Sequence, residues 1–170
     1  MVEVLTPSTS EQLVAVRDMM RAFVAWHRRR HQQDLALIDA YFDAAAFEAE
    51  LASLPGKYAP PRGSLLLATV DGRAAGCVAL RELDADTCEM KRMFVYEDLQ
   101  GHGVGRALGE AIIDRARTAG YRRMVLDTSI RQTEAQALYH RLGFRDVPPY
   151  YELPPELRNW LVFMELPLPR

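Results

Sequence analysis

The chain has 170 residues, of which 49% are hydrophobic, and its formal net charge is −2 at pH 7. This length suits one domain with a sizeable core, and the small negative charge gives no overall attraction to nucleic acid. No apolar run approaches the roughly 20 residues that cross a membrane, and the opening residues lack the pattern of a signal peptide. Two cysteines are too few for a disulfide framework, so we expect a cytoplasmic protein that binds neither nucleic acid nor membrane.

The first third of the chain is predicted to be a short strand followed by two helices. Residues 2–5 alternate as a strand, and Ser8 or Ser10 is suited to cap the helix that follows. Apolar side chains recur every three or four positions over residues 10–31, which predicts one amphipathic helix. A second helix is predicted over residues 40–54, before the helix-ending pair Pro55-Gly56.

The middle of the chain is predicted to form three antiparallel strands. Residues 64–70 and 74–83 are rich in apolar residues and flank Asp71-Gly72, a strong hairpin signal. Residues 87–96 continue the meander as its third strand.

The last third alternates helices and strands. Its predicted elements are a helix at 104–119, a strand at 122–128, a helix at 132–142, a short strand from Phe144 and a strand at 160–166. The segment bracketed by Pro148-Pro149 and Pro154-Pro155 is expected to be irregular. Strands followed by helix–strand units predict an α/β fold with a mixed central sheet and helices on both faces.

A glycine-rich loop stands between the strand at 87–96 and the helix at 104–119. Gly101, Gly103 and Gly105 let the backbone turn tightly and approach a ligand closely. The start of the following helix presents unpaired N–H groups and the positive end of the helix dipole, which together suit a phosphate or pyrophosphate. The alternative is a tight strand-to-helix connection that binds nothing.

The spacing of the glycines shows which kind of phosphate-binding loop the sequence fits. The Gly56-Lys57 pair is followed by Tyr58, so the chain has no P-loop. A dinucleotide fingerprint also fails, because the third glycine comes one position early, although Asp127 lies at a suitable distance beyond it. The pattern that fits is Q-x-x-G-x-G, from Gln100 to Gly105.

With this loop the sequence resembles the GCN5-related N-acetyltransferase (GNAT) superfamily. A second, separate motif agrees, because Leu138-Tyr139 and Leu142-Gly143-Phe144 match the LY-x-x-LGF signature of the family. The resemblance covers nearly all of the chain and is strongest over residues 88–146. It implies a single N-acetyltransferase domain over residues 1–170, with a V-shaped splay between the two central parallel strands. It also implies acetyl-CoA as the cosubstrate.

The resemblance assigns the cofactor contacts to the strand before the loop, to the loop and to the next helix. Backbone groups of the strand would pair with the pantetheine arm, and N–H groups of the loop would hold the pyrophosphate. Gln100 has the alternative of bracing the loop, and Arg106 that of a solvated charge. The expected cofactor-binding residues are Met93, Phe94, Val95, Gln100, Gly101, His102, Gly103, Val104, Gly105, Arg106 and Gln132.

Two residues are expected to be catalytic. Tyr139 occupies the position of a general acid that protonates the departing thiolate, and its alternative is a packing aromatic. Glu89 lies eleven residues before Gln100, the offset of the glutamate base in histone-type members of the family. Its alternatives are an anchor for the substrate, or a solvated charge paired with Lys91 or Arg92.

The acceptor side is expected to involve Tyr150 and Tyr151 in the segment before the last strand, and Trp26 near the end of the first long helix. The arginines at 28–30 are either a solvated helix end or a rim for an anionic acceptor. The predicted function is direct transfer of an acetyl group to a primary amine of a small molecule or an exposed protein amine, without a metal. The alternative is a non-catalytic acyl-CoA-binding or sensing module. A homodimer is an open alternative to a monomer.

Overall fold

The computed structural model describes residues 1–169, so Arg170, the last residue of the expected domain, lies outside them. A seven-stranded sheet runs through the molecule in the order β1-β2-β3-β4-β5-β7-β6. Its strands are β1 Val2–Leu5, β2 Ser64–Val70, β3 Arg73–Glu82, β4 Thr87–Val95, β5 Arg123–Ser129, β6 Arg145–Val147 and β7 Leu161–Pro167. Neighbouring strands are antiparallel except for β4 and β5, which are parallel. The predicted mixed sheet is therefore confirmed.

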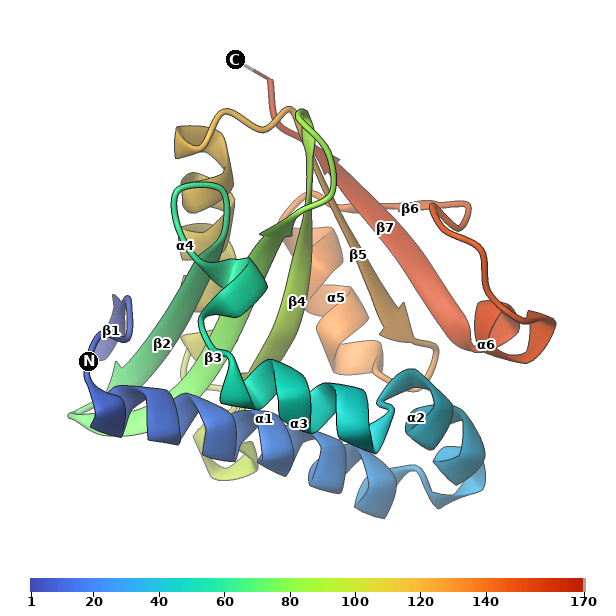
Figure 1. Ribbon diagram of the computed structural model, residues 1–170, viewed down its shortest axis with the longest axis horizontal. Helices are drawn as coiled ribbons and strands as arrows, with labels where there is room; N and C mark the ends of the chain where they lie inside the picture. Colours follow the sequence, from blue (N-terminus) through green and yellow to red (C-terminus); the bar gives the residue numbers. More distant parts are fainter. Residues whose placement is uncertain (170) are drawn as a thin grey trace.

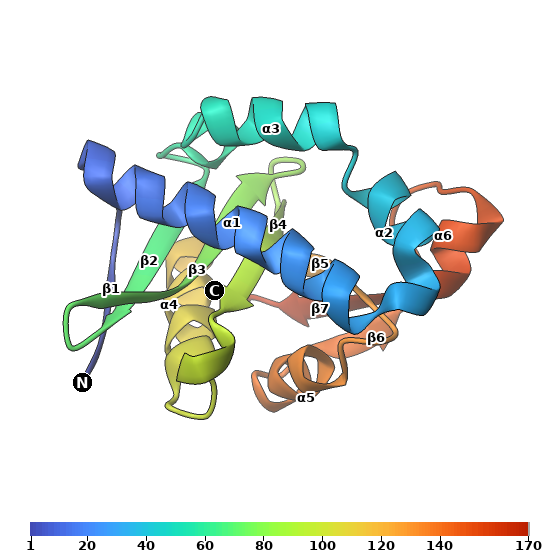
Figure 2. The same cartoon turned by 90° about the horizontal axis from the view of Figure 1, so that it is seen from below.

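Helices cover both faces of the sheet, as predicted (Figures 1 and 2). The helices are α1 Ser10–Arg30, α2 Leu35–Tyr41, α3 Ala44–Ala52, α4 Val104–Thr118, α5 Thr133–Arg141 and α6 Pro155–Trp160. One apolar core lies between the sheet and α1–α3, and a second lies beneath α4 and α5. The sheet thus separates two cores, and the strand residues alternate between them.

The long first helix begins with a capping box. Thr9 accepts a hydrogen bond from the backbone N–H of Gln12 at 3.1 Å, and the Gln12 side chain accepts one from the Thr9 N–H at 3.2 Å. The prediction of Ser8 or Ser10 as the cap was wrong by one position, because the Thr9 hydroxyl and Gln12 satisfy two free N–H groups reciprocally. The buried stripe of α1 then packs on the sheet, with Phe23 facing Phe94 of β4.

The single helix predicted over 40–54 was wrong. The chain forms α2 and α3 instead, with a break at Phe42 and Asp43. The Asp43 carboxylate accepts a hydrogen bond from the Ala46 N–H at 3.0 Å and starts a new helix there. The helix α6 was also missed, because Pro155 begins it at a first-turn position where no N–H is needed.

A bulge in β4 opens the centre of the sheet. Cys77 pairs with Phe94 and Ala79 with Lys91, so Arg92 and Met93 together face the single residue between Cys77 and Ala79. Arg92 has a φ of +61°, in the left-handed region that non-glycine residues rarely adopt. Such a bulge bends its strand and ends regular pairing.

The parallel pairing of β4 with β5 stops short of both strand ends. It joins Thr87–Glu89 to Arg123–Val125, and beyond this point the strands diverge, as Figure 1 shows. The V-shaped splay expected between the two central parallel strands is therefore present, and its apex lies at Glu89.

A largely buried ion pair holds Arg92 in this conformation. Its guanidinium donates to both carboxylate oxygens of Glu50 on α3, at 2.8 and 3.0 Å, and lies over the rings of Phe42 and Phe47. The Tyr58 hydroxyl donates to the same carboxylate. Burial opposes ionisation of Glu50, but its bonds with Arg92 prevail and lower its pKa to about 2. The ion pair thus fastens α3 to the bulge.

We predict that Glu50→Gln lowers the free energy of unfolding at pH 7 by about 3 kcal/mol, because it leaves the buried Arg92 guanidinium without a counter-charge. The pKa of Glu50 is depressed, so its contribution is present above the ordinary pKa of 4.5 and is lost as pH falls towards about 2. Urea unfolding should therefore show the difference between wild type and variant shrinking below pH 4.5.

Glu48→Gln is the matched control on the same helix, because Glu48 forms an exposed ion pair with Arg21. This variant should stay close to wild type, as exposed pairs contribute little. Equal losses for the two variants would contradict the role given to Glu50.

Candidate active site

The splay between β4 and β5 contains two adjoining cavities. The larger is a groove of about 480 Å³ that runs from the end of β4 along the glycine loop to α5. The smaller is a cavity of about 50 Å³ between the two strands themselves. Phe23, Met93 and Gln132 line both, so the two spaces meet at these residues.

Most of the residues expected to bind the cofactor line the groove. They are Met93, Phe94, Val95, Gln100, Gly101, Gly103, Val104, Gly105, Arg106 and Gln132. His102 does not line it, and its side chain points to the solvent. The structure thus gathers one segment of strand, one loop and one helix start around a single space, in the order that the sequence indicated.

The glycine loop leaves the start of α4 free. Gly103 is the N-cap of this helix with a φ of +83°, and no side chain caps the first N–H groups. A Cβ at Gly105 would lie 3.2 Å from the Leu138 side chain, so a larger residue there would press on α5. Uncapped N–H groups at a helix start attract an anion.

Two side chains of the loop are already engaged. Gln100 Nε2 donates to the carbonyl of Val95 at 3.3 Å, which braces the loop against β4. The Arg106 guanidinium pairs with Glu110 at 2.8 Å and is exposed to the solvent. The Arg106 guanidinium keeps its two terminal NH2 groups for a ligand, and Gln100 keeps its side-chain carbonyl oxygen.

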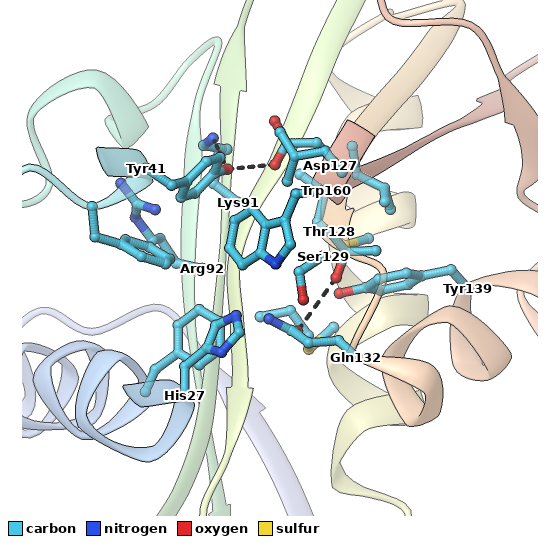
Figure 3. Close-up of a pocket in the computed structure, with 16 residues that line it drawn as sticks. His27, Tyr41, Lys91, Arg92, Asp127, Thr128, Ser129, Gln132, Tyr139 and Trp160 are labelled. Carbon is cyan, nitrogen blue, oxygen red and sulfur yellow. Dashed lines mark hydrogen bonds between the residues drawn. The ribbon is translucent and has the colours of Figure 1, made fainter. Parts of the chain in front are cut away.

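Tyr139 points into the smaller cavity from α5 (Figure 3). Its ring is 6% exposed and packs near Phe144. Within residues 1–169 the Tyr139 hydroxyl has no hydrogen-bond partner. Every polar side-chain atom of these residues that is fully enclosed does have a hydrogen-bond partner, so the Tyr139 hydroxyl is not enclosed and is open to the cavity. Burial, with a smaller effect of Asp127, raises the pKa of Tyr139, so it stays protonated at neutral pH.

Glu89 lies at the apex of the splay and lines neither cavity. Its side chain is 2% exposed, and its two oxygens accept bonds from Arg81 at 2.7 Å and from the Tyr150 hydroxyl at 2.5 Å. Burial alone would raise the pKa of Glu89, but Lys91, Tyr150 and Arg81 together lower it. Because Glu89 is enclosed and lines neither cavity, an amine in either cavity could touch this carboxylate only if the side chains around it moved.

Asp127 is the carboxylate that the smaller cavity does contain. It is half-buried on β5, and it accepts hydrogen bonds from the hydroxyls of Tyr41 on α2 and Tyr151 before α6. Sequence reasoning considered Asp127 only as part of a dinucleotide fingerprint. A usable signal was present, because Met124 and Leu126 point to the α4 core and alternation puts Asp127 on the opposite face.

The three residues expected on the acceptor side lie in two places. Tyr150 and Tyr151 reach Glu89 and Asp127 with their hydroxyls, so they lie on the side of the splay away from α5. Trp26 instead lines the groove of the cofactor residues, and its Nε1 donates to Glu97 at 2.6 Å.

A histidine that the sequence did not single out also reaches the smaller cavity. His27 of α1 lines it, and its Nδ1 lies 2.8 Å from Nδ1 of His31. Burial lowers the pKa of His27 to about 4, so its ring is neutral at pH 7.

Within residues 1–169, no three or more His, Cys, Asp or Glu side chains are grouped as a metal site. None of the helices formed by these residues combines the length and apolar character needed to traverse a membrane.

Comparison with known proteins gives one consistent result. A model of the Acetyltransferase (GNAT) family matches residues 18–144. An uncharacterized N-acetyltransferase of Schizosaccharomyces pombe is 40% identical over 107 residues, covering 62% of this chain and 66% of that protein. N-acetylaspartate synthetase of Homo sapiens is 33% identical over 129 residues, covering 74% of this chain and 42% of that protein. The chain therefore spans less than two thirds of the length of either relative.

The fold is also similar to that of a solved structure. The crystal structure of the PaiA N-acetyltransferase from Thermoplasma acidophilum, in complex with coenzyme A, superposes with a TM-score of 0.72 at 15% identity. The alignment covers 98% of this chain and 99% of that one.

We predict that Tyr150→Phe raises the pKa of Glu89, because the variant removes one of the hydrogen bonds that lower it. It should also lower the free energy of unfolding by about 2 kcal/mol, the usual contribution of a hydrogen bond to a charged group. Carbon-13 NMR of the glutamate carboxyl groups, followed through a pH titration, measures the first effect.

Tyr139→Phe is the control, since the Tyr139 hydroxyl bonds to no other described residue and does not influence Glu89. An unchanged Glu89 titration in Tyr150→Phe would show that this hydrogen bond does not form in solution.

Proposed function

The chain belongs to the GNAT family, and we propose that it is an acetyltransferase that transfers the acetyl group of acetyl-CoA directly to a primary amine of a small molecule or an exposed protein amine. The observation that carries the proposal is the open hydroxyl of Tyr139. It faces a cavity that adjoins the groove of the glycine loop, so a proton donor stands where two substrates can meet.

The residues of the groove fit acetyl-CoA. The free N–H groups from Gly101 to Arg106 offer a cradle for the pyrophosphate, and the β4 edge at Met93–Val95 is not paired with β5. The described side chains around the groove include Arg30, Arg106 and Arg141, which add positive charge near the expected phosphates. Gln132 stands where the groove and the cavity meet, within reach of the arm between them.

Acetyl-CoA, when bound, supplies an acetyl group on a thioester that an amine can attack. Tyr139 would give its proton to the departing sulfur. Its raised pKa means that the phenol is protonated at neutral pH but is a weak acid, so the transfer would depend on its position close to the sulfur. Glu89 would act on the acceptor side through Tyr150 and Lys91 rather than by touching the amine, because its carboxylate is enclosed and lines neither cavity. Before the attack, a water or a cavity residue would take a proton from the ammonium group of the acceptor, because only the neutral amine is a nucleophile.

We also propose that the whole chain is one N-acetyltransferase domain of the cytoplasm. Both cores share the one sheet, which supports a single domain. Cys77 and Cys88 are free and buried, and burial raises the pKa of each thiol to about 12. Such inert, unbridged thiols are usual in a reducing compartment.

Gly103→Val should weaken acetyl-CoA binding by about tenfold or more, because a side chain on this loop keeps the pyrophosphate from the N–H groups of α4. Calorimetry measures the affinity. Gly72→Val is the matched control: Gly72 has a φ of +81° in the β2–β3 turn, and its Cβ, like that of Gly103, would meet nothing within 4 Å. The backbone strain is the same in both variants, so equal affinities would reject the placement of the pyrophosphate.

Tyr139→Phe should keep the affinity for acetyl-CoA and reduce turnover by about 10²- to 10⁴-fold, the usual contribution of general acid catalysis. Release of free thiol with a panel of primary amines measures turnover. A variant with turnover near that of wild type would leave Tyr139 a packing residue. A wild-type protein that binds acetyl-CoA but releases no thiol with any amine would instead support an acyl-CoA-binding module.

A further inference from the structure

Asp127 carries a negative charge that no cation of the described chain neutralises closely. No arginine, lysine or histidine nitrogen of residues 1–169 lies within 4.0 Å of its carboxylate, which is held by two neutral phenols. The other acidic side chains around the site have such partners, as Glu50 has Arg92 and Glu89 has Arg81. A carboxylate has about four acceptor positions, so Asp127 keeps room for further donors.

Lys91 brings a positive charge to the same cavity. Its side chain is 14% exposed, and its ammonium group lies 3.1 Å from the Tyr41 hydroxyl. The nearest carboxylate oxygen is that of Glu89 at 3.9 Å, and this oxygen already accepts the closer bond from Arg81. Lys91 therefore has no tight ion pair of its own.

One hydroxyl oxygen separates these two charges. Tyr41 donates to Asp127 and accepts from Lys91, so the carboxylate and the ammonium group stand on either side of the same phenol, as Figure 3 shows. The cavity thus offers opposite charges a short distance apart. A ligand with the reverse arrangement of charges would match both.

We propose that the acceptor is a free α-amino acid, a proposal that rests on the acetyl transfer proposed above. Its ammonium group binds at Asp127 and its carboxylate binds at Lys91. An α-amino acid holds these two charges on one carbon atom, and its compact head group suits a cavity of about 50 Å³.

The same arrangement discriminates against amines that lack a carboxylate. An ammonium group at Asp127 is brought near the positive charge of Lys91, which repels it. The carboxylate of an amino acid offsets this repulsion, whereas a simple amine or a lysine side chain of a protein has no carboxylate that could offset it. Lys91 is thereby a residue that determines specificity, and Asp127 is the anchor for the reacting nitrogen.

The test compares each common amino acid with the amine that remains when its carboxylate is removed, such as alanine with ethylamine. With acetyl-CoA saturating, thiol release gives kcat/KM for both members of a pair. Wild type should favour the amino acid of its preferred pair by about tenfold or more, the effect expected of a charge-assisted bond. Lys91→Met should bring this ratio close to one.

The chain supplies a matched control, because its two lysines are Lys57 and Lys91. Lys57 is half-exposed and pairs with Glu50 outside the cavity, so Lys57→Met should keep the wild-type ratio. Asp127→Asn should abolish the binding of the preferred amino acid to the protein loaded with coenzyme A, as measured by calorimetry.

Three outcomes overturn the inference. They are equal acetylation of the two members of every pair, an unchanged ratio in folded Lys91→Met, and amino acids that neither react nor bind. In each case acetylation of simple amines or peptide lysines would leave the proposed acetyl transfer standing. Failure of every amine, while acetyl-CoA still binds, would instead count against the proposed function itself.

Discussion

The largely buried ion pair between Arg92 and Glu50 is the constraint on which the site depends. Arg92 adopts a left-handed conformation in the middle of a strand, and the bidentate bond to α3 compensates for it. The resulting bulge ends the pairing of β4 with β5 beyond Glu89, so the sheet opens into a V. Both cavities lie in this opening, one reaching the glycine loop and the other reaching α2.

The ionisable side chains have different roles at different positions in the splay. Glu89 at its apex is enclosed and lines neither cavity, so it organises Arg81, Tyr150 and Lys91 rather than facing a substrate. Further into the opening, the Tyr139 hydroxyl and the Asp127 carboxylate face the cavity from α5 and β5. An acid with a raised pKa and an anion without a close cation thus share one small space, a combination that is typical of sites where chemistry occurs.

Sequence reasoning captured what is local. The strand alternation, the glycine loop and the LY-x-x-LGF motif each lie within a short stretch, and together they indicated the sheet, the splay and the groove. The break at Phe42 was missed because the Asp43 cap competes with an otherwise helical run. The enclosure of Glu89 depends on Arg81 across the β3–β4 hairpin and on Tyr150, which lies 61 positions further along the chain. The contact of Tyr41 with Asp127 joins residues 86 positions apart, which no local pattern reveals.

Amide hydrogen exchange with and without coenzyme A tests most directly whether the splay is a cofactor site. If it is, binding should slow exchange at the free edge of β4, residues 93–95, and at the start of α4, residues 101–106. Strands β6 and β7, on the far side of β5, should be unchanged. Slowed exchange at other segments alone, with none in these two, would contradict the account.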